Sequence, residues 1–296
     1  MNWRKETTVN PLGVHALVWV GGWTEADVRR AVEATAAAGF DLLEIPVLDP
    51  TTVDAGLTRR LLGEYGLKAA CSLGLSFDAD ISSPDPDVAR RGRGLLAAAL
   101  DVTRDIGATY LGGVIYSALG KYPGPATPQG RRHCVESLAW LADRAAADGI
   151  TLGVEVVNRY ESNLLNTAEQ AMALLDEVDA ANLVVHLDTY HMNIEERDFA
   201  SPVELCGQRL GYVHVGESNR GYLGTGTIDF EQFFAALRTV GYQGVVTFES
   251  FSSAVVNPTL SNTLAVWRNL WDDGEDLARA ARRFMLDGLG APARTG

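Results

Sequence analysis

Residues 182–196 read NLVVHLDTYHMNIEE, an apolar run that ends at Asp188 and passes directly into a more polar segment. Leucine and β-branched valine are typical of a buried strand, and Asp188 is the first strongly polar group that this strand could direct outward. His186, two residues earlier, shares the face of Asp188, and we expect it to fill a core position. The stretch therefore predicts a buried strand with a carboxylate at its carboxyl end.

The same pattern of a short apolar run, a loop and an amphipathic segment recurs about eight times along the chain. Apolar residues at i, i+3 and i+4 spacing predict helices between the runs, most clearly at 24–38, 131–147 and 229–239. Strands that alternate with helices form a parallel sheet with right-handed crossovers. The strands are expected at 13–19, 41–45, 67–73, 108–114, 151–156, 183–188, 211–215 and 244–249.

Eight such units predict an α/β fold, a single-domain TIM (β/α)8 barrel, whose functional groups lie at the carboxyl ends of the strands. No linker rich in proline or serine divides the chain, so we expect one domain over residues 1–296. We further expect a short N-terminal extension over about 1–12, a final helix over 258–283 that carries two tryptophans, and a loose C-terminal tail over about 287–296.

The excess of acidic residues argues against two classes of binding partner, nucleic acids and anionic membranes. The chain of 296 residues has 25 Lys and Arg against 38 Asp and Glu, a formal net charge of −13. A chain this acidic repels the phosphates of nucleic acids and anionic membranes, so neither is expected as a partner. The N-terminus lacks an apolar signal-peptide core, and no run approaches the roughly 18 apolar residues of a membrane span. The three cysteines suit a reducing compartment, so we expect a soluble cytoplasmic protein, and a neutral substrate such as a sugar remains open.

Four polar residues end consecutive expected strands in the second half of the chain, roughly one strand-plus-helix unit apart. At one end of a parallel barrel they would build a divalent-metal site, because a carboxylate that is buried unpaired in the lumen costs free energy and a cation would offset this cost. Carboxylate and imidazole donors without thiolate favour Mn²⁺, Mg²⁺ or Co²⁺. Four protein ligands would leave two positions of a six-coordinate ion for substrate oxygens. The residues are Glu155, Asp188, His214 and Glu249.

Four segments of the chain resemble the ketose 3-epimerase family, which includes D-tagatose, D-allulose (psicose) and L-ribulose 3-epimerases. The resemblance extends from about Gly13 to about Trp271, and the Asp-Thr-Tyr-His-Met-Asn-Ile-Glu-Glu run is its most specific part. The segments are GVEVVNRYE (153–161), HLDTYHMNIEE (186–196), YVHVGESNRG (212–221) and TFES (247–250).

The resemblance implies a metal-dependent isomerase. By this resemblance the four strand-end residues match the metal ligands of the family, and Glu161, His191 and Arg220 match positions that bind the C1–C3 end of the sugar. Family members use Mn²⁺, often with Co²⁺ or Mg²⁺ as substitutes. They assemble as homodimers or homotetramers, so a homo-oligomer is expected here.

Epimerisation at C3 of a free ketose removes a proton beside the C2 carbonyl and returns one to the opposite face. A metal bound to O2 and O3 would polarise the carbonyl and stabilise the enediolate that forms. Two bases are then needed, and Glu155 and Glu249 come from the outermost strands of the four-ligand set. We therefore expect these glutamates to be the catalytic acid/bases. The candidate substrate pairs are D-fructose/D-allulose, D-tagatose/D-sorbose and L-ribulose/L-xylulose.

The other end of the sugar would meet the first and third strands. His15, Trp19 and Gly74 end these strands and are expected to wall the C4–C6 end of the pocket. His15 stands where several members of the family have a tyrosine, so the chain departs from the family pattern at this end.

Similar barrels also carry other functions. An aldose–ketose isomerase of the xylose isomerase type usually has two metals and would require more inward carboxylates, whereas an inosose dehydratase-like lyase could use a similar one-metal site. A DNA-repair hydrolase resembling endonuclease IV needs a histidine-rich centre and a basic face, but this chain has five histidines and a net charge of −13. A non-catalytic sugar-binding barrel would seldom need a metal with open positions.

Overall fold

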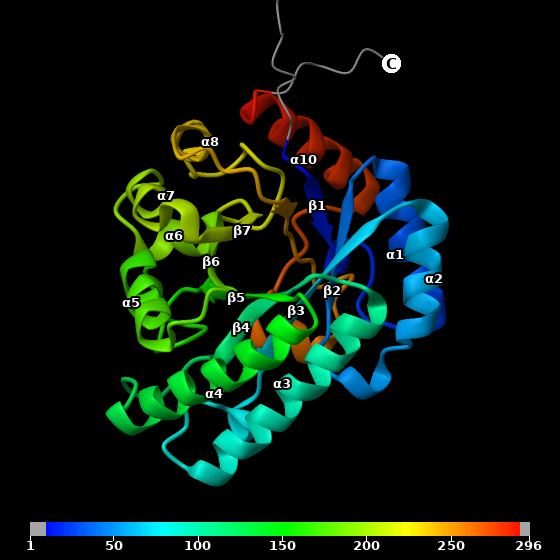
Figure 1. The fold of residues 1–296 in the computed structure, drawn as a ribbon. Coiled ribbons are helices and arrows are strands. Elements are labelled where there is room, and N and C mark those ends of the chain that lie inside the picture. Colours follow the sequence, from blue (N-terminus) through cyan, green and yellow to red (C-terminus); the bar gives the residue numbers. More distant parts are fainter. Residues whose placement is uncertain (1–9, 291–296) are drawn as a thin grey trace, which may run out of the picture.

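Eight parallel strands close into one barrel in the computed structural model, which describes residues 10–290 (Figure 1). Neighbouring strands follow the order of the chain, and β8 closes the barrel by pairing with β1. The single-domain TIM barrel expected from the sequence is therefore confirmed. The strands are β1 Leu12–His15, β2 Leu42–Pro46, β3 Lys68–Leu75, β4 Tyr110–Ala118, β5 Thr151–Val156, β6 Leu183–Asp188, β7 Leu210–Val215 and β8 Val246–Phe248.

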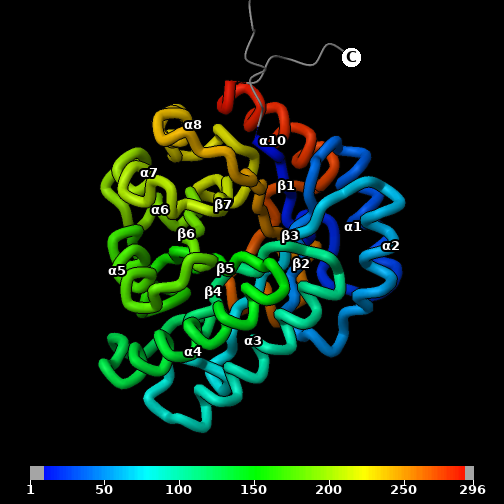
Figure 2. Tube along the Cα trace, in the orientation of Figure 1, coloured from blue at the N-terminus to red at the C-terminus, as the bar shows by residue number. Residues whose placement is uncertain are grey.

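Helices connect the strands and surround the barrel, as the trace in Figure 2 shows. Most of them begin at a side chain that accepts a hydrogen bond from the first turn, and Thr24 and Thr167 form complete capping boxes. Within residues 10–290, no helix is long and apolar enough to cross a membrane. The helices are α1 Glu25–Ala38, α2 Ala55–Tyr65, α3 Pro86–Ile106, α4 Pro128–Ala147, α5 Ala168–Val178, α6 Thr189–Glu195, α7 Ser201–Cys206, α8 Phe230–Thr239, α9 Pro258–Thr263 and α10 Gly274–Gly288, with 3₁₀ turns η1 Ala16–Val18, η2 Pro50–Thr52, η3 Phe77–Ala79 and η4 Gly207–Arg209.

The first strand is shorter than the sequence predicts. The run 13–19 is expected to be one strand, but β1 ends at His15 and the 3₁₀ turn η1 follows it. The cause is local, because Nδ1 of His15 accepts a hydrogen bond from the Leu17 N–H at 3.2 Å and so caps the turn. Trp19 therefore lies beyond the turn, and its indole donates to the Thr35 hydroxyl of α1 at 3.0 Å.

The end of the chain also differs from the expectation of one helix over 258–283. The structure has two helices there, α9 and α10, with an irregular segment between them that contains both tryptophans. Ala265, just after α9, adopts a left-handed φ of 54°, and the Asp273 carboxylate caps the start of α10. The expected extension over about 1–12 and tail over about 287–296 lie largely outside the described residues, although α10 continues to Gly288.

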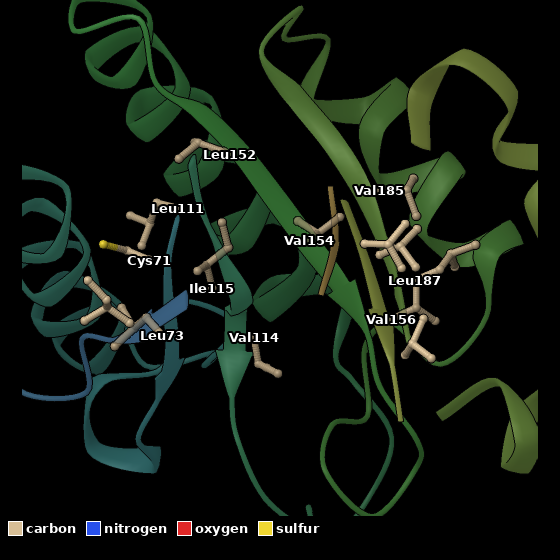
Figure 3. Close-up of a cluster of buried hydrophobic side chains, with 14 of the residues drawn as sticks. Cys71, Leu73, Leu111, Val114, Ile115, Leu152, Val154, Val156, Val185 and Leu187 are labelled. Atoms are coloured by element: carbon tan, nitrogen blue, oxygen red, sulfur yellow. The ribbon is translucent and has the colours of Figure 1, made fainter. Parts of the chain in front are cut away.

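Alternation along the strands divides their side chains between two environments. Val154 and Val156 of β5 lie with Val185 and Leu187 of β6 in the large apolar cluster between sheet and helices (Figure 3). The residues between them, such as Glu155, face the barrel lumen. This alternation is what directs polar groups of neighbouring strands toward a common space.

Candidate active site

Four side chains from consecutive strands meet at the carboxyl end of the barrel. Glu155 and His214 lie in β5 and β7, Asp188 is the last residue of β6, and Glu249 directly follows β8. Asp188 and His214 are partners in the register of β6 and β7. Each of the four offers one ligand atom, and these atoms all lie within 4.8 Å of one another. The structure thus brings together all four residues of the expected ligand set.

The ring of His214 lies between the two glutamates of this cluster. Its Nδ1 is 3.3 Å from Oε1 of Glu155 and 3.5 Å from Oε1 of Glu249. This nitrogen is buried and forms no hydrogen bond to the described part of the chain. A buried imidazole nitrogen that faces carboxylates without a hydrogen bond is suited to ligate a metal ion.

Arg220 brings a positive charge to the same cluster. Its Nη1 donates hydrogen bonds to Oε2 of Glu249 at 2.6 Å and to Oδ2 of Asp188 at 3.3 Å. The guanidinium carbon lies 3.7 Å from the centroid of the Tyr190 ring and 4.9 Å from that of the Phe251 ring. The planar group is therefore held both by ion pairs and by aromatic rings.

The backbone of Arg220 is in the left-handed region, with φ of 59°, which is uncommon for a residue other than glycine. Its N–H donates to the Glu217 carbonyl at 2.8 Å. Its own carbonyl accepts a hydrogen bond from the Ser250 hydroxyl at 2.5 Å, and that hydroxyl accepts from the Trp271 indole at 2.8 Å. The segment after β8 thus supports the conformation that directs Arg220 toward the carboxylates.

His191 and Glu161 form a second polar group beside the cluster. Nδ1 of His191 accepts from the Asn158 N–H at 3.2 Å, so the neutral ring carries its proton on Nε2. That nitrogen lies 3.5 Å from Oδ2 of Asp188 and 4.0 Å from Oε2 of Glu161. The Asn158 amide donates to Oε1 of Glu161 at 2.9 Å, and burial raises the pKa of Glu161 to about 7.

Three buried carboxylates share this space with one guanidinium. Burial raises the pKa values of Glu155 and Asp188, because their charged forms lose hydration. For Glu249 the same effect is outweighed by attraction to His214 and Arg220, which lowers its pKa. The carboxylates outnumber the guanidinium, so a divalent cation would stabilise their charged forms together.

A cavity at this end of the barrel is lined by three residues of the cluster, Glu155, His214 and Glu249. Convergent polar groups in one cavity are typical of a small-ligand site. Trp19 is not among its lining residues and instead lines a separate cavity beside α1, so the expectation that Trp19 walls the sugar pocket is wrong. A Cβ on Gly74 would lie 2.7 Å from the Leu119 side chain, so glycine leaves room for another lining residue. The lining includes all five residues expected to contact substrate: Glu161, His191, Arg220, His15 and Gly74.

Comparisons with known proteins identify the family of this chain. The chain matches the family described as xylose isomerase-like TIM barrel over residues 32–287. It is 55% identical over 273 residues to the L-ribulose 3-epimerase of Methylomonas sp. (strain DH-1), which covers 92% of this chain and 96% of that relative. It is 51% identical over 280 residues to the ketose 3-epimerase of Arthrobacter globiformis, covering 95% of this chain and 97% of the relative. This chain belongs to the ketose 3-epimerase family.

A solved structure supports the same assignment. The D-allulose 3-epimerase from Methylomonas sp., crystallised in complex with D-allulose, has a TM-score of 0.93 at 53% identity, covering 94% of this chain and 97% of that chain. The resemblance inferred from four sequence segments is therefore confirmed, and as a member of the ketose 3-epimerase family the protein is a carbohydrate isomerase.

The residues of this family member fit a divalent cation. Carboxylate oxygens and one imidazole nitrogen are donors that Mn²⁺, Co²⁺ and Mg²⁺ accept in proteins. The only other grouping with ligand geometry within residues 10–290 joins His186 to Glu155 and His214, two residues of the first set. The described residues therefore offer one cation site rather than two independent ones.

Sequence reasoning missed several residues of this site, of which Glu44 is the most deeply buried. It lies in the middle of β2, and its carboxylate reaches Nε2 of His214 at 2.7 Å. A charged residue inside the apolar run DLLEI (41–45) is a signal that could have found it, because alternation places Glu44 on the lumen side of its strand. Asn158, Tyr190 and Phe251 carry no comparable signal.

Proposed function

We propose that this protein epimerises free ketoses at C3 with the help of one divalent cation, Mn²⁺ in the first place and Co²⁺ or Mg²⁺ as substitutes. The observation that carries the proposal is the four-residue cluster, whose ligand atoms lie within 4.8 Å of one another and three of whose members line a cavity. Glu155, Asp188, His214 and Glu249 would hold the cation. When bound, the cation supplies Lewis-acid polarisation of the C2 carbonyl and stabilises the negative charge that develops on the substrate.

Glu155 and Glu249 would be the two catalytic acid/bases. They approach Nδ1 of His214 from β5 and from the end of β8, at 3.3 Å and 3.5 Å. Because these strands are not neighbours in the barrel, the two carboxylates can flank a substrate from different sides. One removes the C3 proton and the other returns a proton to the opposite face, and their roles exchange with the direction of reaction.

The remaining residues would hold and orient the sugar. Arg220 presents a fixed guanidinium that binds substrate oxygens and supports developing negative charge. His191 directs Nε2–H into the site, and Glu161 lies beside it. His15 and Gly74 line the cavity elsewhere and would contact the C4–C6 end.

The substrates proposed are the pairs D-fructose/D-allulose, D-tagatose/D-sorbose and L-ribulose/L-xylulose. The names of the relatives, L-ribulose 3-epimerase and D-allulose 3-epimerase, support the first and last pairs. A homodimer or homotetramer and a cytoplasmic location stay predictions.

The test is epimerisation in D₂O by Mn²⁺-loaded protein, with an EDTA-stripped sample as control. L-ribulose, D-allulose, D-fructose and D-tagatose are incubated separately, the cation is removed, and the sugars are analysed by ¹³C NMR. We expect a C3 epimer with deuterium at C3, formed only with the cation. An aldose without solvent deuterium would identify a hydride-shift aldose–ketose isomerase instead. No reaction with any of the four sugars would overturn the proposal.

A further inference from the structure

A fully buried carboxylate contacts the far side of the proposed metal ligand His214. Oε2 of Glu44 lies 2.7 Å from Nε2 of His214 and accepts a hydrogen bond from the Tyr212 hydroxyl at 2.9 Å. Glu44 is in β2 and His214 in β7, and β1 and β8 lie between these strands in the closed barrel. The contact therefore crosses the lumen rather than following one pair of neighbouring strands.

The chemistry of this contact determines which nitrogen of His214 carries a proton. An ionised carboxylate can only accept hydrogen bonds, so a hydrogen bond to Glu44 requires a proton on Nε2. In the neutral ring the lone pair then lies on Nδ1, the nitrogen that faces Glu155 and Glu249 at 3.3 Å and 3.5 Å. That same Nδ1 is the buried atom without a hydrogen-bond partner among the described residues.

Stability alone gives no reason for a carboxylate at this position. Glu44 has no exposed surface, and burial of a charge costs free energy that an apolar residue in the same strand would not. Its other oxygen, Oε1, forms no hydrogen bond within residues 10–290 and lies 3.7 Å from Nε2 of His15. The closest side-chain contact of Glu44 is thus the imidazole that faces the carboxylate cluster, at 2.7 Å.

We propose that Glu44 is a positioning residue that holds His214 with its proton on Nε2 and its Nδ1 lone pair directed at the cation. The inference rests on the proposed function, since it assigns a role toward the same cation site. Glu44 touches neither substrate nor cation in this role and acts through His214. Carboxylate–histidine–metal arrangements of this kind raise the basicity of the ligand and fix its ring orientation.

The first experiment measures Mn²⁺ affinity by calorimetric titration of the purified full-length protein, wild type and variants. Glu44→Gln keeps the size of the side chain but removes its charge, and its amide can donate to Nε2 and so favour the wrong tautomer. We expect Mn²⁺ to bind about 10- to 100-fold more weakly to this variant. Tyr212→Phe is the matched control, because it removes the other hydrogen bond to Oε2 of Glu44 and leaves His214 in contact with that oxygen. We expect the Mn²⁺ affinity of this variant to differ from that of the wild type by less than about threefold.

A second experiment observes the tautomer directly, and its measurement on the wild-type protein does not depend on a variant that folds. Wild-type protein with ¹⁵N-labelled histidine is saturated with Mg²⁺, a diamagnetic cation, and the imidazole N–H protons are assigned by NMR. We expect the His214 proton on Nε2, and a changed Nε2 resonance in Glu44→Gln. A proton on Nδ1 in the wild type would overturn the inference, as would an Mn²⁺ affinity of folded Glu44→Gln equal to that of the wild type.

The two proposals fail in different ways. Wild-type protein that binds Mn²⁺ more tightly than Glu44→Gln but puts no deuterium at C3 of any ketose would contradict the proposed function and support the positioning role. Wild-type protein that epimerises ketoses while Glu44→Gln keeps full Mn²⁺ affinity would support the proposed function and contradict the positioning role.

Discussion

The guanidinium of Arg220 donates a 2.6 Å hydrogen bond to Oε2 of Glu249, a residue that we propose as both metal ligand and acid/base. The left-handed backbone of Arg220 and the rings of Tyr190 and Phe251 hold the guanidinium in that place. One fixed positive charge thus lies beside a carboxylate that would take up and release a proton in the proposed reaction. Under the proposed function, this single pair of side chains would link substrate binding, cation binding and proton transfer.

Arg220→Lys should lower kcat/KM by at least about tenfold, because the ammonium group of lysine lacks the planar guanidinium that donates several hydrogen bonds and packs on aromatic rings. The measurement is steady-state epimerisation with the best ketose of the substrate panel. Arg159→Lys is a suitable control, since Arg159 is an exposed residue that pairs with Glu195 outside the cavity lining. Equal kcat/KM for Arg220→Lys and the wild type would remove Arg220 from the proposed substrate contacts.

Glu249→Gln should lower kcat by about 10²- to 10⁴-fold, and by more where cation binding also weakens. Under a two-base scheme, Glu155 can still exchange the C3 proton of one epimer with D₂O although the other epimer no longer forms. NMR of each epimer incubated separately with Mn²⁺-saturated variant measures both processes. Glu177→Gln, which changes an exposed partner of Arg131, serves as control. Near-normal turnover by Glu249→Gln is incompatible with two glutamate bases.

Glu161→Gln should stabilise the cation-free protein at high pH and not at low pH. Burial raises the pKa of Glu161 from 4.5 to about 7 in the folded protein, so the folded state binds the proton more tightly than the unfolded state. Stability is therefore lost as pH rises from about 4.5 to 7, by up to about 3 kcal/mol, and Gln removes this loss.

The measurement for Glu161→Gln is urea unfolding in EDTA at pH 5 and pH 8. Gln keeps an oxygen that can accept the hydrogen bond from Asn158, so the comparison isolates the charge. We expect the advantage of the variant to be larger at pH 8, and Glu169→Gln on the exposed start of α5 to follow the wild type. A constant difference between the two pH values would show that Glu161 does not titrate in this window.

The three thiols should be inert in the native protein. Cys71, Cys134 and Cys206 are buried, and burial raises the pKa of Cys71 and Cys206 to about 12 and that of Cys134 well above its usual value. Because the thiolate is the reactive form, DTNB at pH 8 should label none of them before unfolding and all three in guanidinium chloride. Rapid labelling of the native protein would show that one of these sites opens to solvent.

Much of the fold could be predicted because apolar periodicity is a local property. The expected strands at 151–156 and 183–188 coincide with β5 and β6. Two errors arose where a single side chain or backbone angle interrupts a periodic run. His15 caps a 3₁₀ turn and ends β1 early, and Ala265 at φ of 54° separates α9 from α10. Neither the cap at His15 nor the left-handed φ of Ala265 changes the apolar pattern from which the strands and helices were predicted.

The sequence by itself determined the order of strands and helices and the positions of Glu155, Asp188, His214 and Glu249 at strand ends. Both follow from alternation along neighbouring residues, and a parallel barrel brings equivalent strand ends together. Only the tertiary structure decided that Glu44 meets His214 and that Arg220 meets Glu249, pairs that are 170 and 29 residues apart in the chain. These contacts depend on how the barrel closes across its lumen and on a left-handed backbone at Arg220, and no local pattern encodes either of them.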